Sequence, residues 1–327
     1  MTGATNTALL GIGGYRPRKV VPNADIIERI ESSDEWIQTR SGIKTRRVAA
    51  PDETVPMMSR AAAETALERS GVRPEQLDCV IVATVSHMLQ TPAVATQIAE
   101  ELGATPAAAF DISAACAGFC YGVALASDMI RGGTATYVLV IGVERLTDLT
   151  DFEDRGTAFL FADGAGAAVV GPSEESGISP VVWGSDGSKY NLIRQEEGWD
   201  QVFEADKPEW PHLRMEGNSV FRWASFDVAK VCHQTLDAAG IGVDDLDAFI
   251  PHQANMRITD AMARTLKLPE RVAIARDIAD QGNTSAASIP LAMERMLDEG
   301  TISSGDKALL VAFGAGLVYA AQVVTVP

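Results

Sequence analysis

Short runs of consecutive apolar residues alternate along this chain with longer segments in which apolar residues recur at helical spacing. The run at 107–112 predicts a buried strand, and residues 119–131 predict a helix that ends at Gly132-Gly133. The order of strand, small-residue turn and apolar helix returns in the second half of the chain. This alternation is typical of an α/β protein.

The two halves of the chain also repeat one another. Residues 70–81, SGVRPEQLDCVI, are matched by AGIGVDDLDAFI at 239–250, an offset of 169 residues. In both copies a helix precedes the glycine and a buried strand follows Leu-Asp, and further helices are predicted at 92–102 and 257–268. Each half closes with a strand, at 137–142 and 308–314. We interpret these matches as duplication of a β/α unit, with halves at 1–172 and 173–327.

Two of the predicted helices carry no charge. The segments 114–126 and 286–293 are apolar or small on all sides, which predicts helices buried between other layers. We therefore expect a layered fold in which helices lie between two sheets. At the offset of 169 residues Cys116 aligns with Ser285, so the turns before these helices are expected to be equivalent.

Composition and charge exclude several classes of function. The chain has 327 residues, of which 46% are hydrophobic, and it contains no apolar run that could span a membrane. Its polar start has no signal-peptide pattern, so we expect a cytoplasmic protein. The four cysteines show neither zinc spacing nor a disulfide framework, and neither a metal nor a disulfide is expected. The net charge of −17 opposes general binding to nucleic acid.

Basic residues nevertheless gather in two stretches of the sequence. Solvated surface charge and a site for an anionic partner both remain open as explanations. The residues are Arg40, Lys44, Arg46 and Arg47, and then Arg222, Arg257, Arg264 and Lys267.

Cys116 lies between the predicted strand at 107–112 and the predicted helix at 119–131. Buried cysteine is usually a small hydrophobic residue, so packing is the plainer explanation. Its neighbours here are alanines and a glycine, which suit a tight turn that directs free N–H groups and the positive end of the helix dipole at the sulfur. Both effects favour the thiolate. Cys120, one turn further along the helix, is expected to pack in the core and to be inert.

His252 and Asn283 are the best partners that the sequence offers for a reactive cysteine. His252 follows the apolar residues 249–251, and the ends of buried strands carry the sites of many α/β proteins. Asn283 lies in the turn that matches the cysteine turn, where capping a helix and a catalytic role are both open. The glycines at 11–14 follow a strand and those at 163–166 suggest a turn into a strand, and neither motif fits a nucleotide site. Residues 313–316 predict a tight turn after the last buried strand.

These residues together resemble the thiolase superfamily, and within it the β-ketoacyl-[acyl-carrier-protein] synthase III enzymes. The resemblance runs from residue 10 to the C-terminus and implies a layered α-β-α-β-α fold of two duplicated halves. The motifs that carry it are SSDEWI (32–37), RSGI (40–43), AACAGF (114–119), DRGTAFLFADGAGAAV (154–169), EGNSVFRWA (216–224), PHQANMRI (251–258), GNTSAAS (282–288) and AFGAG (312–316).

The resemblance implies a role for each matching residue. Cys116 matches the nucleophile that accepts an acyl group from acyl-CoA, and His252 and Asn283 match the pair that promotes decarboxylation of malonyl-ACP and stabilises the enolate. The backbone N–H groups of Cys116 and Ala315 match the oxyanion hole. Residues that match CoA contacts are Trp36, Arg40, Arg155, Asn218 and Asn255, and those that match the docking patch for the carrier protein are Arg222, Arg257 and Arg264.

The family also implies a homodimer with no cofactor, since acyl-CoA is a substrate. Leu89-Gln90-Thr91 matches the loop that crosses the dimer interface to close the partner's acyl pocket, and Leu146 and Phe161 are further candidate walls. Some members place a bulky phenylalanine in this loop, so we expect a roomier pocket that accepts branched starters such as isobutyryl and isovaleryl groups.

The implied activity is the initiating condensation of type II fatty-acid synthesis. Histidine and asparagine suit it because both can donate hydrogen bonds to an enolate oxygen as neutral groups. Three alternatives stay open: a priming ketosynthase of an aromatic polyketide pathway, an acyltransferase that forms no carbon–carbon bond, and a partner subunit without activity. Retention of Cys116 argues against the last of these.

Overall fold

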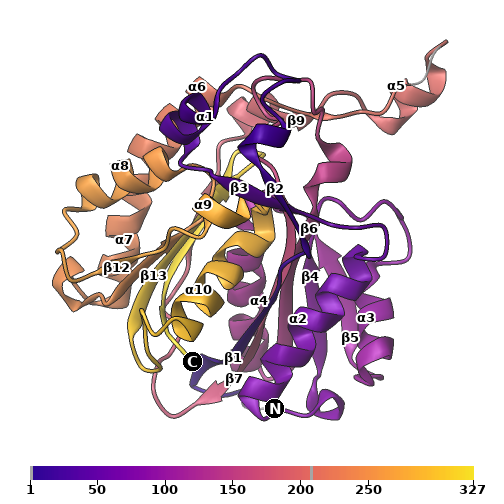
Figure 1. Ribbon diagram of the computed structural model, residues 1–327. Coiled ribbons are helices and arrows are strands. Elements are labelled where there is room, and N and C mark those ends of the chain that lie inside the picture. Colours follow the sequence, from indigo (N-terminus) through magenta and orange to yellow (C-terminus); the bar gives the residue numbers. More distant parts are fainter. Residues whose placement is uncertain (1–2, 207–208) are drawn as a thin grey trace.

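The computed structural model describes residues 3–206 and 209–327, and two five-stranded sheets form its frame (Figure 1). The first sheet has the order β1-β7-β6-β4-β5 and the second β8-β14-β13-β11-β12. The strands of the first are β1 (Asn6–Tyr15), β4 (Cys79–Ala83), β5 (Ala108–Ile112), β6 (Val138–Arg145) and β7 (Asp163–Ser173). Those of the second are β8 (Val182–Ser185), β11 (Ala248–Pro251), β12 (Ala273–Ile274), β13 (Lys307–Gly314) and β14 (Val318–Thr325).

The two sheets pair their strands in the same way. In the first, β4 is parallel to β5 and β6, and β7 runs antiparallel between β6 and β1. In the second, β11 is parallel to β12 and β13, and β14 runs antiparallel between β13 and β8. The boundary expected after residue 172 falls one residue before the end of β7.

Helices cover both faces of each sheet, which gives the layered α/β fold that was expected. α4 (Gly118–Gly132) and α10 (Ser288–Asp298) lie between the sheets and share one apolar core with both of them. α2 (Val55–Ser70) and α3 (Val94–Leu102) cover the outer face of the first sheet, and α7 (Ala229–Ala239) and α8 (Met256–Leu266) that of the second (Figure 1).

The remaining elements lie outside these layers. They comprise two antiparallel sheets of two strands each, three helices that lie near the upper edge in Figure 1, and the short α9 that packs against β3. The elements are β2 (Lys19–Pro22), β3 (Thr45–Val48), β9 (Ile193–Gln195), β10 (Leu213–Met215), α1 (Asp34–Ser41), α5 (Trp199–Glu204), α6 (Gly217–Trp223) and α9 (Ile278–Gln281).

The repeated glycines have the same structural task in both halves. Gly71 ends α2 with φ of 69°, and Gly240 ends α7 with φ of 69°, each donating its N–H back to the last turn. Only glycine adopts this left-handed conformation without strain, which explains why the repeat has a glycine at this point.

One strand, β14, was missed because it follows a tight turn, and β7 begins at Asp163, within the residues where a turn was expected. The strands expected to close each half are followed by β7 and β14, which pair with them antiparallel. The glycines at 11–14 lie within β1 and those at 163–166 within β7, so the turn expected at 163–166 is wrong, whereas the strand expected after it is present. These strands need glycine because helices pack directly on them: a Cβ on Gly166 would lie 2.6 Å from the Pro290 ring, and one on Gly13 would lie 2.4 Å from the carbonyl oxygen of Ala62.

The two small-residue turns are equivalent, but the residues that match in them are separated by one residue more than the expected offset of 169. Ala115 begins η3 (Ala115–Ala117) with φ of 46°, and Ser285 begins η8 (Ser285–Ala287) with φ of 48°. Ser285 therefore matches Ala115, and Cys116 matches Ala286. The chain from the start of β11 to Ser285 is one residue longer than the chain from the start of β4 to Ala115, which an offset carried along the sequence does not reveal.

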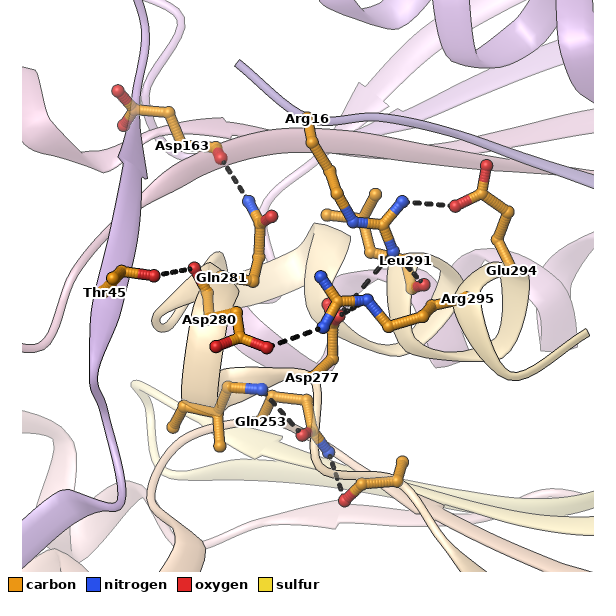
Figure 2. Close-up of polar contacts among 12 residues, drawn as sticks. Arg16, Thr45, Asp163, Gln253, Asp277, Asp280, Gln281, Leu291, Glu294 and Arg295 are labelled. Atoms are coloured by element: carbon orange, nitrogen blue, oxygen red, sulfur yellow. Dashed lines mark hydrogen bonds and ion pairs between the residues drawn. The ribbon is translucent and has the colours of Figure 1, made fainter. Parts of the chain in front are cut away.

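A buried ion-pair cluster ties the two halves together beneath the turn at 282–288 (Figure 2). Asp277, almost fully buried, lies 2.8 Å from Arg295 Nε and 3.7 Å from Arg16 Nη2, and Arg16 also contacts Glu294. Gln253 accepts a hydrogen bond from Ile278 N at 3.2 Å. Because Arg16 follows β1 whereas the other groups belong to the second half, the cluster holds α9 against the first half.

Candidate active site

One cavity of about 300 Å³ brings together the three side chains that the sequence singled out for chemistry. Cys116 comes from η3, His252 from the end of β11, and Asn283 from the turn after α9, and all three line this cavity. The three lie up to 167 residues apart in the sequence, the separation of Cys116 from Asn283. Their convergence follows from the matching topology of the two halves around α4 and α10.

Cys116 lies in a turn that Gly314 approaches closely. A Cβ on Gly314 would lie 2.8 Å from Cys116 N and 2.9 Å from Cys116 Cβ, so only glycine leaves room for the nucleophile here. Cys120 is fully buried in α4, as expected for a packing residue.

The protonation state of Cys116 differs from the expectation. Burial is the main reason that the pKa of the thiol is raised to about 12; the nearby Ser285 side chain opposes the rise, and the negative charge of Glu144 contributes to it. The cavity leaves part of the residue accessible, but protein surrounds the sulfur. Loss of water therefore outweighs the helix dipole, and the resting group is a thiol.

His252 is held in one orientation and stays uncharged. Its backbone N–H donates to Val311 O at 2.8 Å, Nδ1 lies 2.7 Å from Ser288 Oγ, and its ring meets Phe313 edge to face with centroids 5.3 Å apart. Burial lowers the pKa of His252 to about 3. With Nδ1 engaged by Ser288, the other ring nitrogen is the one available to the cavity.

Asn283 is both a cap and a cavity residue, so the two explanations weighed for it are compatible. Its Oδ1 accepts a hydrogen bond from Ser285 N at 2.9 Å, at the start of η8. Its backbone joins Leu160 and Ala162 through hydrogen bonds of 2.9 Å each. Because the carbonyl oxygen is engaged, the NH₂ end of the amide is the part left for chemistry.

Three polar residues near these groups were missed by the sequence reasoning. Ser288 orients His252, and Ser285 hydrogen bonds to Glu144 and lies close to Cys116. Glu144 is fully buried at the end of β6. An acidic residue closing an otherwise apolar strand, YVLVIGVE, was the signal that could have identified it.

The residues matched to CoA contacts gather at one end of the cavity. Trp36, Arg40, Asn218 and Asn255 line it, and the guanidinium groups of Arg40 and Arg155 lie 5.5 Å and 4.9 Å from the centre of the Trp36 ring. Asn255 Nδ2 donates to the carbonyl oxygen of Arg40 at 2.9 Å. An aromatic ring beside two guanidinium groups suits a planar base and anionic phosphates.

The residues matched to the acyl pocket divide between two regions. Phe161 lines the cavity of Cys116, whereas Leu146 is buried in the cluster behind it. Leu89 and Gln90 line a different depression with Trp199, Thr91 is exposed, and none of the three lines the Cys116 cavity of its own chain.

The remaining matched groups lie around the site. Ala315 follows Gly314 and lines a separate depression with Ala114 and Ala115, so its part in an oxyanion hole stays a prediction. The basic residues Arg222, Arg257 and Arg264 are exposed on α6 and α8, and Arg257 also lines the cavity mouth beside Phe221.

Arg46 corrects one expectation about basic residues. It is fully buried, donates to Val21 O at 3.1 Å and contacts Asn23, and burial lowers its pKa to about 10. It is therefore neither surface charge nor a site for an anionic partner. A Cβ on Gly282 would lie 2.9 Å from Arg46 Cβ, which shows that Arg46 packs beneath the Asn283 turn.

The described residues offer neither a cluster of metal ligands nor a helix that could span a membrane. No group of three or more His, Cys, Asp or Glu side chains within 3–206 and 209–327 is arranged to hold a metal ion. Among the helices of the described chain, none has the length and apolar character needed to cross a membrane.

The fold defines a thiolase-fold enzyme whose cavity holds a cysteine, a histidine and an asparagine, and comparison with known proteins agrees with this class. Residues 110–187 match the family described as 3-oxoacyl-[acyl-carrier-protein (ACP)] synthase III, and residues 236–326 match its C-terminal part. The beta-ketoacyl-[acyl-carrier-protein] synthase III 1 of Streptomyces coelicolor is 60% identical over 99% of this chain and 98% of its own length, and the Streptomyces glaucescens enzyme is also 60% identical, with the same coverage. The chain belongs to the β-ketoacyl-[acyl-carrier-protein] synthase III family.

Solved structures show the same likeness. The priming β-ketosynthase of the R1128 polyketide pathway has a TM-score of 0.98 and 46% identity, covering 100% of this chain and 98% of that one. The 3-oxoacyl-[acyl-carrier-protein] synthase III of Aquifex aeolicus has a TM-score of 0.89 and 39% identity, covering 98% and 100%.

Proposed function

We propose that this enzyme transfers a short acyl group from acyl-CoA to Cys116 and then condenses it with malonyl-ACP to give β-ketoacyl-ACP and CO₂, the initiating step of type II fatty-acid synthesis. The observation that carries the proposal is the single cavity that joins Cys116, His252 and Asn283 to the Trp36 end, where CoA would bind. The relatives' names agree with this assignment.

The first half-reaction is nucleophilic acyl transfer. Cys116 sulfur attacks the thioester carbonyl, the carbonyl oxygen takes the negative charge, and collapse of the intermediate expels CoA. The backbone N–H groups of Cys116, just before the start of α4, and of Ala315 are the candidate donors to that oxygen. The substrate pantetheine arm would reach from Trp36 to Cys116 along the cavity. No cofactor is required for this chemistry.

The second half-reaction places an enolate between His252 and Asn283. Loss of CO₂ from malonyl-ACP leaves negative charge on the thioester oxygen of the enolate. Two preformed neutral hydrogen-bond donors stabilise this charge. The low pKa of His252 suits this role, because the ring stays neutral and donates through the nitrogen that Ser288 leaves free. The enolate carbon then attacks the acyl group on Cys116.

A homodimer would complete the acyl pocket. The loop at 85–91 exposes Val85, Met88 and Leu89, with exposed fractions of 36, 42 and 57%, and this apolar stretch suits the interface of a second copy. Multi-angle light scattering should then give twice the chain mass. A roomy pocket further predicts comparable kcat/KM for acetyl-, isobutyryl- and isovaleryl-CoA, and a strict acetyl preference would contradict it.

Exposed arginines on α6 and α8 offer a docking surface for an acidic carrier protein. Arg257 lines the cavity mouth, and Arg222 and Arg264 are exposed on the same two helices, in a protein whose net charge is otherwise strongly negative. Replacing Arg264 with Glu should raise the KM for malonyl-ACP and leave acylation by acyl-CoA unchanged, since Arg264 does not line the cavity and only the second step uses the carrier protein.

Mass spectrometry of the intact protein tests the proposal. Wild type should gain one acyl group from acetyl- or isobutyryl-CoA and lose it, with release of CO₂, when malonyl-ACP is added. Cys116→Ala should gain none, whereas the matched control Cys120→Ala should behave as wild type because that thiol is buried in α4. Acylation without decarboxylation would identify an acyltransferase, and absence of acylation would refute the enzyme proposed here.

A priming ketosynthase of a polyketide pathway is the second candidate, favoured by the TM-score of 0.98 to the R1128 enzyme. Both candidates use the same chemistry, so the carrier protein distinguishes them. Relative kcat/KM for malonyl groups on a fatty-acid and a polyketide carrier protein from the same organism should differ, and a preference for the polyketide carrier would select this alternative.

A further inference from the structure

Glu144 is a buried carboxyl group that the chemistry described so far does not use. It has no exposed surface, at the end of β6. Its Oε2 accepts hydrogen bonds from Ser86 Oγ at 2.6 Å, Val85 N at 3.1 Å and Thr84 Oγ1 at 3.4 Å. One carboxyl oxygen is thus satisfied by the loop after β4, and the other is directed elsewhere.

Ser285 connects that second oxygen to the nucleophile. Glu144 Oε1 accepts a hydrogen bond from Ser285 Oγ at 3.1 Å, and the Ser285 side chain lies close enough to the Cys116 sulfur to affect the pKa of the thiol. Ser285 N donates to Asn283 Oδ1 at 2.9 Å, which holds the bridging residue in place. Cys116, Ser285 and Glu144 therefore lie next to one another where η3 packs on η8 and η8 packs on β6.

Each half-reaction moves a proton at the Cys116 sulfur. The thiol must lose its proton when it is acylated, and the sulfur must regain one when the new carbon–carbon bond expels it. His252 accepts a proton poorly, because its pKa is lowered to about 3. Burial raises the pKa of Glu144 to about 7, which suits a group that both accepts and donates near neutral pH.

We propose that Glu144, acting through the Ser285 hydroxyl, accepts the Cys116 proton during acylation and returns a proton to this sulfur during condensation. The proposal rests on the proposed function and adds to it. Glu144 touches no substrate atom and acts on the sulfur only through Ser285, so it is a positioning residue.

In acylation, the S–H bond breaks as sulfur attacks the thioester. The thiol proton passes to Ser285 Oγ while the Ser285 hydroxyl proton passes to Glu144 Oε1, so the serine is unchanged and Glu144 becomes neutral. The electron pair of the broken acyl–sulfur bond leaves with CoA as a thiolate, which takes a proton from solvent. The buried site holds the same net charge until CoA departs, which avoids creating a new buried anion.

In condensation, the steps at the sulfur run in reverse. The enolate carbon forms its bond to the acyl carbon, and the bond from that carbon to Cys116 breaks with its electron pair on sulfur. Ser285 donates its hydroxyl proton to sulfur and receives the Glu144 proton. The sum of both halves consumes one acyl-CoA, one malonyl-ACP and one proton, and yields β-ketoacyl-ACP, CO₂ and CoA.

The other ionisable groups around Glu144 do not offer this route. On its own face of the sheet, η3 contributes Cys116 and α4 contributes Cys120, whose pKa burial raises to about 12. The loop after β4 and η8 contribute hydroxyl groups. The neighbouring Arg145 pairs with Asp148 at 3.0 Å, and Asp163 opposite it is bound by Ala49 and Thr147.

The two half-reactions should show opposite pH dependence controlled by one group. Acylation needs ionised Glu144, so its rate should rise through pH of about 7, while discharge of the acyl-enzyme by malonyl-ACP needs the protonated form and should fall through the same range. Single-turnover mass spectrometry measures both. Glu144→Gln keeps the size of the side chain but cannot take up a proton, so both pH limbs should disappear and acylation should slow by about 10²-fold or more.

Two further variants separate this role from folding. Ser285→Ala breaks the bridge and should act like Glu144→Gln, and Ala115 shows that alanine fits the same left-handed turn. Asp163→Asn is the matched control, another buried carboxyl group that is bound by Ala49 and Thr147, and it should keep both pH limbs.

Two results would overturn the role of Glu144 alone. If Glu144 only raises the thiol pKa through its charge, Glu144→Gln will be acylated faster than wild type. If Glu144 takes no part, Glu144→Gln will keep the wild-type rates and both pH limbs. A wild type that is not acylated at all would instead refute the proposed function first and this role with it.

Discussion

Gly314→Ala tests how closely the active-site turn is packed. The added Cβ would lie 2.8 Å from Cys116 N, 2.9 Å from Cys116 Cβ and 3.2 Å from Cys116 Sγ. Carbon and backbone nitrogen do not approach to 2.8 Å, so either β13 or η3 must shift by several tenths of an ångström. Overpacking of this kind costs about 1–3 kcal/mol of stability.

The shift would also move the nucleophile. A misplacement of about 1 Å can cost about 10²-fold in rate, so we expect acylation to slow by that order even where the protein remains folded. Thermal unfolding and single-turnover acylation, each compared with wild type, measure the two effects. Gly132→Ala is the matched control: nothing lies within 4 Å of its Cβ at the end of α4, and the change should be neutral or stabilise by up to about 1 kcal/mol. A Gly314→Ala protein with wild-type acylation and stability would refute the packing argument.

Three further predictions follow from the same structure. Asp277→Ala leaves Arg16 and Arg295 without their buried partner and should lower the free energy of unfolding in denaturant by about 3–5 kcal/mol, whereas Asp298→Ala, at an exposed surface pair, should cost less than about 1 kcal/mol. Trp36→Ala removes the ring between two guanidinium groups and should raise the KM for acyl-CoA more than it lowers kcat, which steady-state kinetics will show. Asn283→Ala should acylate and then fail to discharge with malonyl-ACP, and release of CO₂ at the wild-type rate would contradict its role.

Much of the fold could be predicted because its signals are local. The glycines at 71 and 240 end helices in both halves, and the helices at 118–132 and 288–298 lie between the sheets, as the uncharged segments 114–126 and 286–293 predicted. Cys116, His252 and Asn283 were identified because each follows a strand or occupies a small-residue turn, features that a few neighbours define. The first residues of β7 were taken for a turn because alanine and glycine have weak strand preference, and pairing with β1 and β6 decides their conformation.

The sequence by itself therefore determined the layers, the repeat and the three side chains that come together in one cavity. Tertiary structure alone decided their environment: the Cys116 thiol stays protonated, Arg46 is buried, and Glu144 hydrogen bonds to Ser285, which lies 141 residues further along the chain. Periodicity and turn chemistry depend on residues a few positions apart. Desolvation and hydrogen-bonded contact depend on every group that packing brings near, and those groups come from both halves of the chain.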